Sequence, residues 1–116
     1  RQPMVLNEKK EEYFDLNQES PHMLIACKAK MKNINKISAV VHVDNSCRVQ
    51  TLTNKTNPFF YKLLKNFYHK SGVPVILNTS FNIKGQPIVN DSEDAIKCFK
   101  KYKIDVLILE NFIIEK

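Results

Sequence analysis

A run of amide and hydroxyl side chains at residues 78–82 directly follows the apolar residues 73–77. The apolar residues predict a short buried strand, which puts the polar run at the carboxyl end of a sheet, where ligands commonly bind. Several donors in one place suit phosphate or carboxylate oxygens. The alternative is a loop that uses Asn and Ser for turn geometry, and the residue types alone favour it. The run consists of Asn78, Thr79, Ser80, Phe81 and Asn82.

Arg48 and His42 flank a polar break at residues 44–46. A guanidinium at the start of a strand can hold a phosphate through two parallel hydrogen bonds, although a local ion pair with Asp44 is the more frequent arrangement. His42 ends an apolar run. It is a candidate general base or zinc ligand, while a hydrogen-bonded histidine at a strand end is more common.

The familiar metal and nucleotide motifs are absent from the sequence. It has no HExxH, no paired CxxC and no EF-hand spacing, so we expect no metal in this chain. It also has no GxxxxGK[ST] or GxGxxG loop, so a nucleotide would have to be bound in another way. No GxSxG motif marks Ser80 as a nucleophile.

In the first part of the chain, two strands around a tight turn are expected to position Arg48. Residues 37–43 are rich in β-branched side chains and residues 48–53 alternate apolar with polar, which predicts a strand on each side of residues 44–46. Before them we expect an extended run at 1–7, helical turns at 8–15, a loop at 16–21 and a strand within 23–30 followed by a solvated loop.

The second part of the chain contains two expected helices. Asn57 and Pro58 suit the start of the first helix and Ser71-Gly72 its end, with an apolar stripe from Phe59 to Phe67 that we interpret as core packing. The second helix should begin at Asp91 or Ser92 and bury Ala95, Ile96 and Phe99. Strands at 106–109 and 112–114 complete an α/β (α+β) fold with a mixed sheet.

Composition sets wider limits. The chain has 116 residues, 43% of them hydrophobic, which fits one domain, and no apolar run approaches the roughly 18–20 residues of a membrane span. Three widely spaced cysteines indicate a reducing, cytoplasmic setting. A net charge of +6 favours anionic partners without selecting among metabolites, nucleic acid and lipid. Because the first residue is Arg1, we expect a piece of a larger protein.

Several collinear segments resemble the carboxy-terminal part of the O-carbamoyltransferases that act on nodulation factor, cephamycin and tobramycin. They are PMVL, EEYF, SPHML, ISAVVHVDNSCRVQT, NPFFYKLL, GVPVILNTSFNIKGQPIV, SEDAIKCF and IDVLIL. The resemblance implies a single YrdC-like domain with a twisted mixed sheet, joined to an amino-terminal domain of the actin-like ATPase type (Kae1-like). It implies that this domain forms a carbamoyl-adenylate from carbamoyl phosphate and ATP. The partner domain, which carries a metal, then passes the carbamoyl group to a substrate hydroxyl.

The resemblance also implies roles for individual residues. Arg48 matches an arginine expected to hold the phosphate of carbamoyl phosphate, and Ser80 matches a phosphate-contacting serine; both are the expected catalytic residues. Basic residues that precede the PMVL segment in the family would lie upstream of Arg1, so weak binding by this chain alone is expected. Turnover by this chain alone is not expected, because the hydroxyl-bearing substrate and the metal belong to the amino-terminal domain. The other implied substrate-binding residues are Asn78, Thr79, Asn82, Lys84, His42 and Asp44.

The sequence departs from the family pattern at three positions, where Asn45 replaces a usual glycine, Cys47 a usual small residue and Gln86 a usual glutamate. The resemblance implies small-molecule substrates and no nucleic-acid or membrane partner, and it leaves the oligomeric state open. Two alternatives compete with it. One is an RNA-binding module, which would show steep salt dependence, and the other is a docking domain without chemistry of its own.

Overall fold

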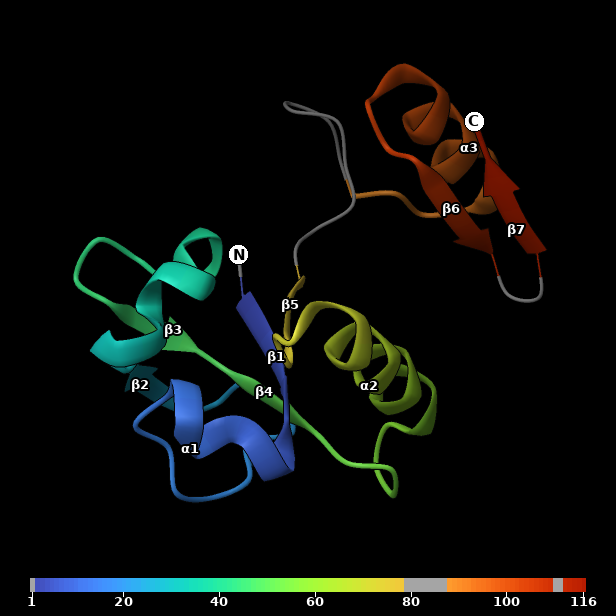
Figure 1. Ribbon diagram of the computed structural model, residues 1–116. Coiled ribbons are helices and arrows are strands. Elements are labelled where there is room, and N and C mark those ends of the chain that lie inside the picture. Colours follow the sequence, from blue (N-terminus) through green and yellow to red (C-terminus); the bar gives the residue numbers. More distant parts are fainter. Residues whose placement is uncertain (1, 79–87, 110–111) are drawn as a thin grey trace. The chain divides into compact units, whose positions relative to one another are not determined.

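The computed structural model describes residues 2–78, 88–109 and 112–116 (Figure 1). The chain forms two compact units, Arg1–Thr79 and Ser80–Lys116. The first contains β1 (Gln2–Leu6), α1 (Lys10–Tyr13), β2 (Ala26–Lys28), β3 (Ser46–Arg48), β4 (Gln50–Leu52), α2 (Pro58–Ser71) and β5 (Val75–Asn78). The second contains α3 (Ser92–Lys101), β6 (Val106–Leu109) and β7 (Phe112–Glu115). Short 3₁₀ helices cover Asn7–Lys9, Met31–Lys36 and Ser38–Val40.

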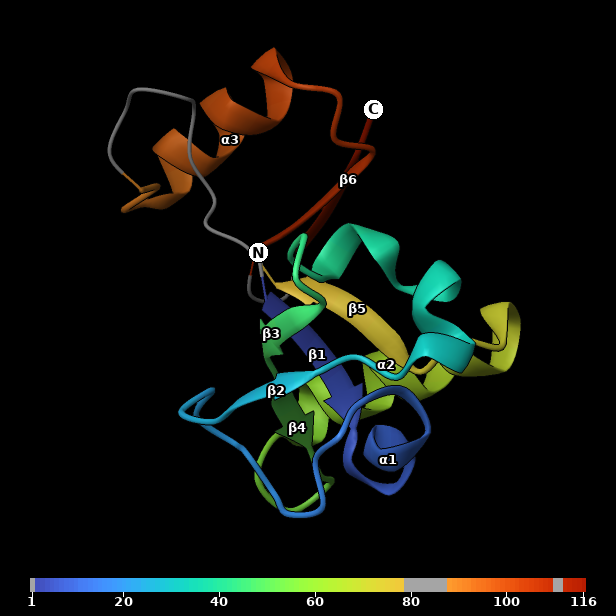
Figure 2. The same cartoon turned by 90° about the vertical axis from the view of Figure 1, so that its left-hand side faces the viewer.

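The central sheet of the first unit has the order β4-β1-β5. β1 is parallel to β4 and antiparallel to β5, which confirms the predicted mixed sheet. Because side chains alternate along a strand, Met4 and Leu6 pack against Leu64 of α2, while Val5 joins a separate cluster with Phe14. Helices α1 and α2 therefore lie on opposite sides of this sheet (Figures 1 and 2). A strand covered on both faces requires the apolar run found in β1.

The remaining described strands form two separate pairs, β2-β3 and β6-β7, so one continuous sheet is not observed among the described residues. The strand expected over residues 48–53 is divided at Val49. β3 pairs with β2, whereas β4 pairs with β1 in the central sheet. Val49 lies between β3 and β4 in the sequence and is fully buried. Its side chain therefore anchors in the core the residue at which the chain passes from the β2-β3 pair to the central sheet.

The strand predicted over residues 37–43 is wrong. This segment instead contains the 3₁₀ helix Ser38–Val40, followed by irregular backbone. Ile37 is buried, but Ala39 and Val43 are exposed, so the apolar side chains do not all face the core as a buried strand would require. The strand expected within residues 23–30 is also shorter, Ala26–Lys28, and the solvated loop after it contains the 3₁₀ helix Met31–Lys36.

Helix α2 begins and ends where the sequence predicts. Pro58 occupies its first turn, and Gly72 ends it with a φ of 77°, a left-handed conformation that glycine adopts without strain. The predicted side-chain cap by Asn57 is wrong, because its Oδ1 accepts a hydrogen bond from Thr56 Oγ1 at 3.1 Å and caps no helix N–H. The apolar stripe predicted to be core is also wrong in part: Leu64 is fully buried, whereas Phe60 and Leu63 are exposed.

The second unit follows its prediction closely. Asp91 caps α3 by accepting a hydrogen bond from the Asp94 N–H at 2.8 Å. Ala95 and Phe99 are buried against Leu107 of the β6-β7 hairpin. The longest helix in the described ranges is α2, with 14 residues, and none of the described helices has the length and apolar character needed to cross a membrane.

Candidate functional site

A tight turn between His42 and Ser46 leads into β3. The His42 N–H donates to the Ser46 carbonyl at 3.1 Å, and the Asn45 N–H donates to the His42 carbonyl at 2.9 Å. Asn45 has a φ of 65°, a left-handed conformation that Asn tolerates better than most residues, which suits a position where the resemblance implies glycine. The turn therefore fixes His42 next to Ser46, two residues before Arg48.

Asp44 stabilises this turn. Its Oδ1 accepts hydrogen bonds from the Ser46 N–H at 3.0 Å and the Ser46 hydroxyl at 2.6 Å. These bonds favour the charged carboxylate and hold the pKa of Asp44 below its ordinary value. Asp44, predicted as a substrate-binding residue, is thus occupied by the turn and does not line the cavity beside it.

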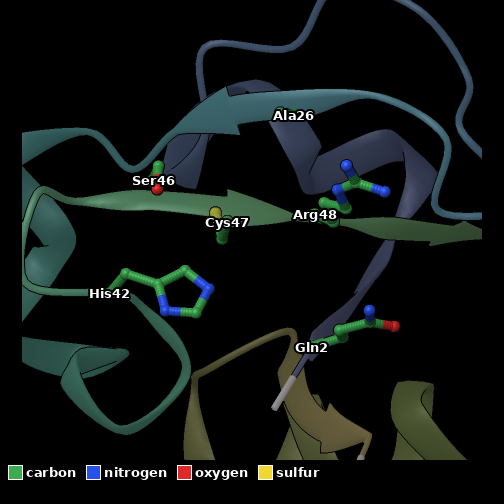
Figure 3. Close-up of a pocket in the computed structure, with 6 residues that line it drawn as sticks. All are labelled: Gln2, Ala26, His42, Ser46, Cys47 and Arg48. Atoms are coloured by element: carbon green, nitrogen blue, oxygen red, sulfur yellow. The ribbon is translucent and has the colours of Figure 1, made fainter.

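A cavity of about 370 Å³ lies beside β3 (Figure 3). Figure 3 shows the His42 imidazole reaching toward the space between β3 and the start of β1, where Gln2 lies. Its described lining residues offer a guanidinium, an imidazole and a carboxamide, and none of them is a carboxylate, a donor set that suits an anion. The residues that line it are Gln2, Ala26, His42, Ser46, Cys47 and Arg48.

Arg48 is exposed at the end of β3, directly opposite Ala26 of β2. The small alanine side chain leaves the guanidinium uncovered. Within residues 2–78, 88–109 and 112–116, the only salt bridges join Lys9 to Glu12 and Lys65 to Glu8. The ion pair with Asp44 that the sequence favoured is therefore not formed, and Arg48 is an exposed lining residue of the cavity.

His42 is exposed and does not end a strand, so the structural role favoured for it from the sequence is wrong. Its backbone is fixed by the turn, and its ring lines the same cavity as Arg48. In the described part of the chain, no group of three or more His, Cys, Asp or Glu side chains comes together as a metal site.

Cys47 forms a buried wall of the cavity, and Cys27 lies opposite it in the β2-β3 pair. All three cysteines are free. The Cys47 thiol donates to the Cys27 carbonyl oxygen at 3.7 Å. Interaction with the Cys27 side chain raises the pKa of Cys47 well above its usual range, with burial adding to the rise, and the same interaction lowers the pKa of Cys27. Cys47 therefore stays protonated at neutral pH and is a poor nucleophile.

Asn78 is the last residue of β5, and it lies opposite Gln2 in the central sheet. The sheet thus brings one residue of the polar run next to a residue that lines the cavity. The other predicted residues of this segment lie outside the described residues, namely Thr79, Ser80, Asn82 and Lys84. Nothing in the structure tests their expected roles.

Four residues that line the cavity beside β3 are not marked as site residues by the sequence. They are Gln2, Ala26, Ser46 and Cys47. Gln2 is polar at the start of an otherwise apolar strand, and a polar residue at the end of a buried strand is the kind of signal that could have been used. Cys47 could have been found only from the pairing of β2 with β3, because nothing in the local sequence predicts which strand faces it.

The family model described as carbamoyltransferase C-terminus matches residues 2–116. An uncharacterized Synechocystis protein is 40% identical over 98% of this chain and 22% of its own length. Nodulation protein NolNO of Sinorhizobium fredii is 35% identical over 98% of this chain and 17% of its own length. The 3′-hydroxymethylcephem-O-carbamoyltransferase of Streptomyces clavuligerus is 37% identical over 68% of this chain and 15% of its own length.

The chain spans only about a fifth of the length of such relatives, 22% in the Synechocystis protein. The family model nevertheless covers nearly every residue of the chain, including the turn before Arg48, the polar run after β5 and the second unit. The similarity is thus continuous from β1 to the last strand. This chain belongs to the carbamoyltransferase C-terminus family.

Proposed function

We propose that this chain is the substrate-activating part of an O-carbamoyltransferase and that it binds carbamoyl phosphate in the cavity beside β3. The observation that carries the proposal is the cavity lining, which includes Arg48 and His42 and, among the described residues, no carboxylate. Family membership supplies the carbamoyl chemistry. A volume of about 370 Å³ falls in the lower part of the range of small-molecule sites, as a small metabolite requires.

In this proposal, Arg48 holds the phosphate of carbamoyl phosphate through two parallel hydrogen bonds. The Gln2 carboxamide and the His42 imidazole provide further donors nearby, while the Ser46 hydroxyl, whose proton is donated to Asp44, is left to accept. Fixed donors of this kind stabilise charge that develops on phosphate oxygens and need little reorganisation during the reaction. Arg48 is the proposed catalytic residue among the described side chains.

The proposed reaction joins the carbamoyl group to the α-phosphate of ATP. Atoms balance when carbamoyl phosphate and water give carbamate and phosphate, and an oxygen of carbamate then displaces pyrophosphate to form carbamoyl-adenylate. We assign Ser80 to catalysis and Asn78, Thr79, Asn82 and Lys84 to substrate binding, as the resemblance implies. The carbamoyl group then passes to a hydroxyl held by an amino-terminal domain, which is also the proposed location of the metal.

The proposal includes a cellular compartment. The free thiols Cys27, Cys47 and Cys98 support a reducing compartment, and we propose the cytoplasm. The chain is proposed to work joined to its amino-terminal partner domain and to be inactive in turnover by itself.

Thermal unfolding with and without carbamoyl phosphate tests the proposal. At about 100-fold above its Kd, the ligand should stabilise the native state by about 2.7 kcal/mol, which raises the Tm of a domain this size by about 10 °C. Inorganic phosphate has the phosphate group of carbamoyl phosphate but lacks the carbamoyl group, so it should raise the Tm less. The same titration is made on a longer protein that includes the residues before Arg1.

Comparing this chain with the longer protein shows whether the residues before Arg1 contribute to binding. A rise in both supports the cavity as the binding site, and a rise only in the longer protein adds the preceding residues to it. If carbamoyl phosphate changes the Tm of neither protein, the proposal is contradicted.

A further inference from the structure

Helix α2 has two apolar faces, and within residues 2–78 only one of them is covered. On the inner face, Leu64 is buried against the central sheet, with Tyr61 and Tyr68 packed beside it. The side chains of the outer face remain largely in solvent. They are Phe59, Phe60, Leu63 and Phe67, with exposed fractions of 60%, 45%, 42% and 40%.

These four side chains form one continuous stripe, here called the outer stripe of α2. Phe60, Leu63 and Phe67 follow the i, i+3, i+7 spacing, and Phe59 is four residues before Leu63, so all lie on neighbouring turns of one helix face. The rings of Phe59 and Phe60 pack edge to face with centroids 5.3 Å apart. Ring pairs in this geometry are favourable, so the stripe has an ordered aromatic end.

The lysines of α2 leave the apolar side chains of the outer stripe exposed. Lys65 is turned to the inner edge, where its Nζ contacts Glu8 Oε1 at 3.1 Å and Tyr61 OH at 3.5 Å. Lys62 is exposed on the polar side of the helix, and the exposed Lys70 follows the stripe, three residues after Phe67. An ordered apolar surface of three phenylalanines and a leucine is unusual on a free surface and marks interaction sites.

We propose that the outer stripe of α2 is the docking surface for the part of the polypeptide that precedes this segment in longer carbamoyltransferases. This inference rests on the proposed function, in which an amino-terminal domain acts with this chain. The chain corresponds to about a fifth of its relatives, at most 22% of the first three, so most of each relative lies outside it. Interfaces between domains of one polypeptide commonly bury about 600–1,500 Å² of surface, and the outer stripe offers an ordered apolar centre for one.

A second copy of this chain fits the stripe poorly. Helix α2 contains Lys62, Lys65 and Lys70 and no acidic residue, and of these lysines Lys65 contacts Glu8. Two such helices packed against each other would bring like charges together around the apolar stripe, which disfavours association. The proposed partner surface is therefore apolar at its centre and acidic at its rim.

Thiol labelling at single introduced cysteines tests this surface. Leu63→Cys and Phe67→Cys are placed in the stripe, and Lys62→Cys on the polar side of the same helix serves as the matched control. Each variant is made in this chain and in a longer carbamoyltransferase that contains it. Labelling rates are read by peptide mass mapping, which separates the new thiol from Cys27, Cys47 and Cys98.

Docking should slow labelling at positions 63 and 67 in the longer protein by about tenfold or more, since the centre of an interface is fully buried. Labelling at position 62 should change by less than about twofold, because rim positions stay in contact with water. Equal rates at position 63 in both proteins would overturn the inference. So would protection in this chain alone that increases with its concentration, because a second copy would then occupy the stripe.

Arg48→Ala in the longer protein distinguishes failure of the docking surface from failure of the proposed function. If positions 63 and 67 are not protected while Arg48→Ala abolishes carbamoyl-phosphate-dependent release of pyrophosphate, only the docking surface is wrong. If both positions are protected while Arg48→Ala stays fully active, the docking surface holds and the proposed role of the cavity fails.

Discussion

Arg48→Ala in a longer carbamoyltransferase should lower carbamoyl-phosphate-dependent pyrophosphate release by about 100- to 1,000-fold, the usual cost of removing one preorganised donor from a charged transition state. The structure supports a large effect because the guanidinium lines the cavity and makes no ion pair among the described residues. The measurement is the initial rate of pyrophosphate release, with kcat and KM determined separately.

Arg48→Lys is the matched control for this prediction. Lysine keeps the positive charge but lacks the planar fork of donors, so it should recover only part of the lost rate. Unfolding curves should match those of the wild type, because Arg48 is exposed and its removal leaves no cavity in the core. Full activity of Arg48→Ala would remove Arg48 from the site.

Leu64→Ala should lower the free energy of unfolding of this chain by about 2–5 kcal/mol, the range measured for large-to-small changes at buried positions. Leu64 is fully buried between α2 and the central sheet, where it contacts the cluster of Met4, Leu6 and Leu52. Its removal takes away the contact that holds the helix on the sheet. The value is measured by urea unfolding of the 116-residue chain.

The adjacent residue gives the control, since Leu63→Ala removes the same atoms from the same helix. Leu63 is 42% exposed, so its replacement should cost only about 1 kcal/mol or less in this chain. Similar losses for the two variants would show that the outer stripe is packed as core, contrary to the structure and to the docking surface inferred from it.

The sequence predicts local structure well where local chemistry determines it. Helix α2 begins at Pro58 and ends before Gly72 because both residues restrict or permit particular backbone angles regardless of the rest of the fold. Asp91 likewise caps α3 through a bond to its own first turn. The turn at Asn45 was predicted for the same reason.

Predictions failed where tertiary packing decides the outcome. The apolar residues 37–43 suit a strand by composition, but only a neighbouring strand could have shown whether they pair, and the observed backbone turns after Ile37 instead. The stripe of α2 could not be assigned to core or surface from its spacing, because Leu63 and Leu64 are equally apolar and only the sheet selects Leu64.

The candidate site was predicted only in part, because tertiary packing also decides which residues line the cavity. Arg48 and His42 were identified because their residue types suggest chemistry, and the structure brings both to one cavity. Gln2 is 40 residues from His42 in the sequence, and its position follows only from the pairing of β1 with β4 and β5. The YrdC-like fold and the roles of Ser80 and its neighbours stay predictions from the resemblance.

Pyrophosphate release by a longer carbamoyltransferase containing this chain, with each substrate omitted in turn, tests the central claim most directly. If the chain activates the carbamoyl group, release requires carbamoyl phosphate and ATP together, and one phosphate is formed for each pyrophosphate. Release from ATP that does not depend on carbamoyl phosphate, or consumption of carbamoyl phosphate without pyrophosphate, would contradict the proposed formation of carbamoyl-adenylate.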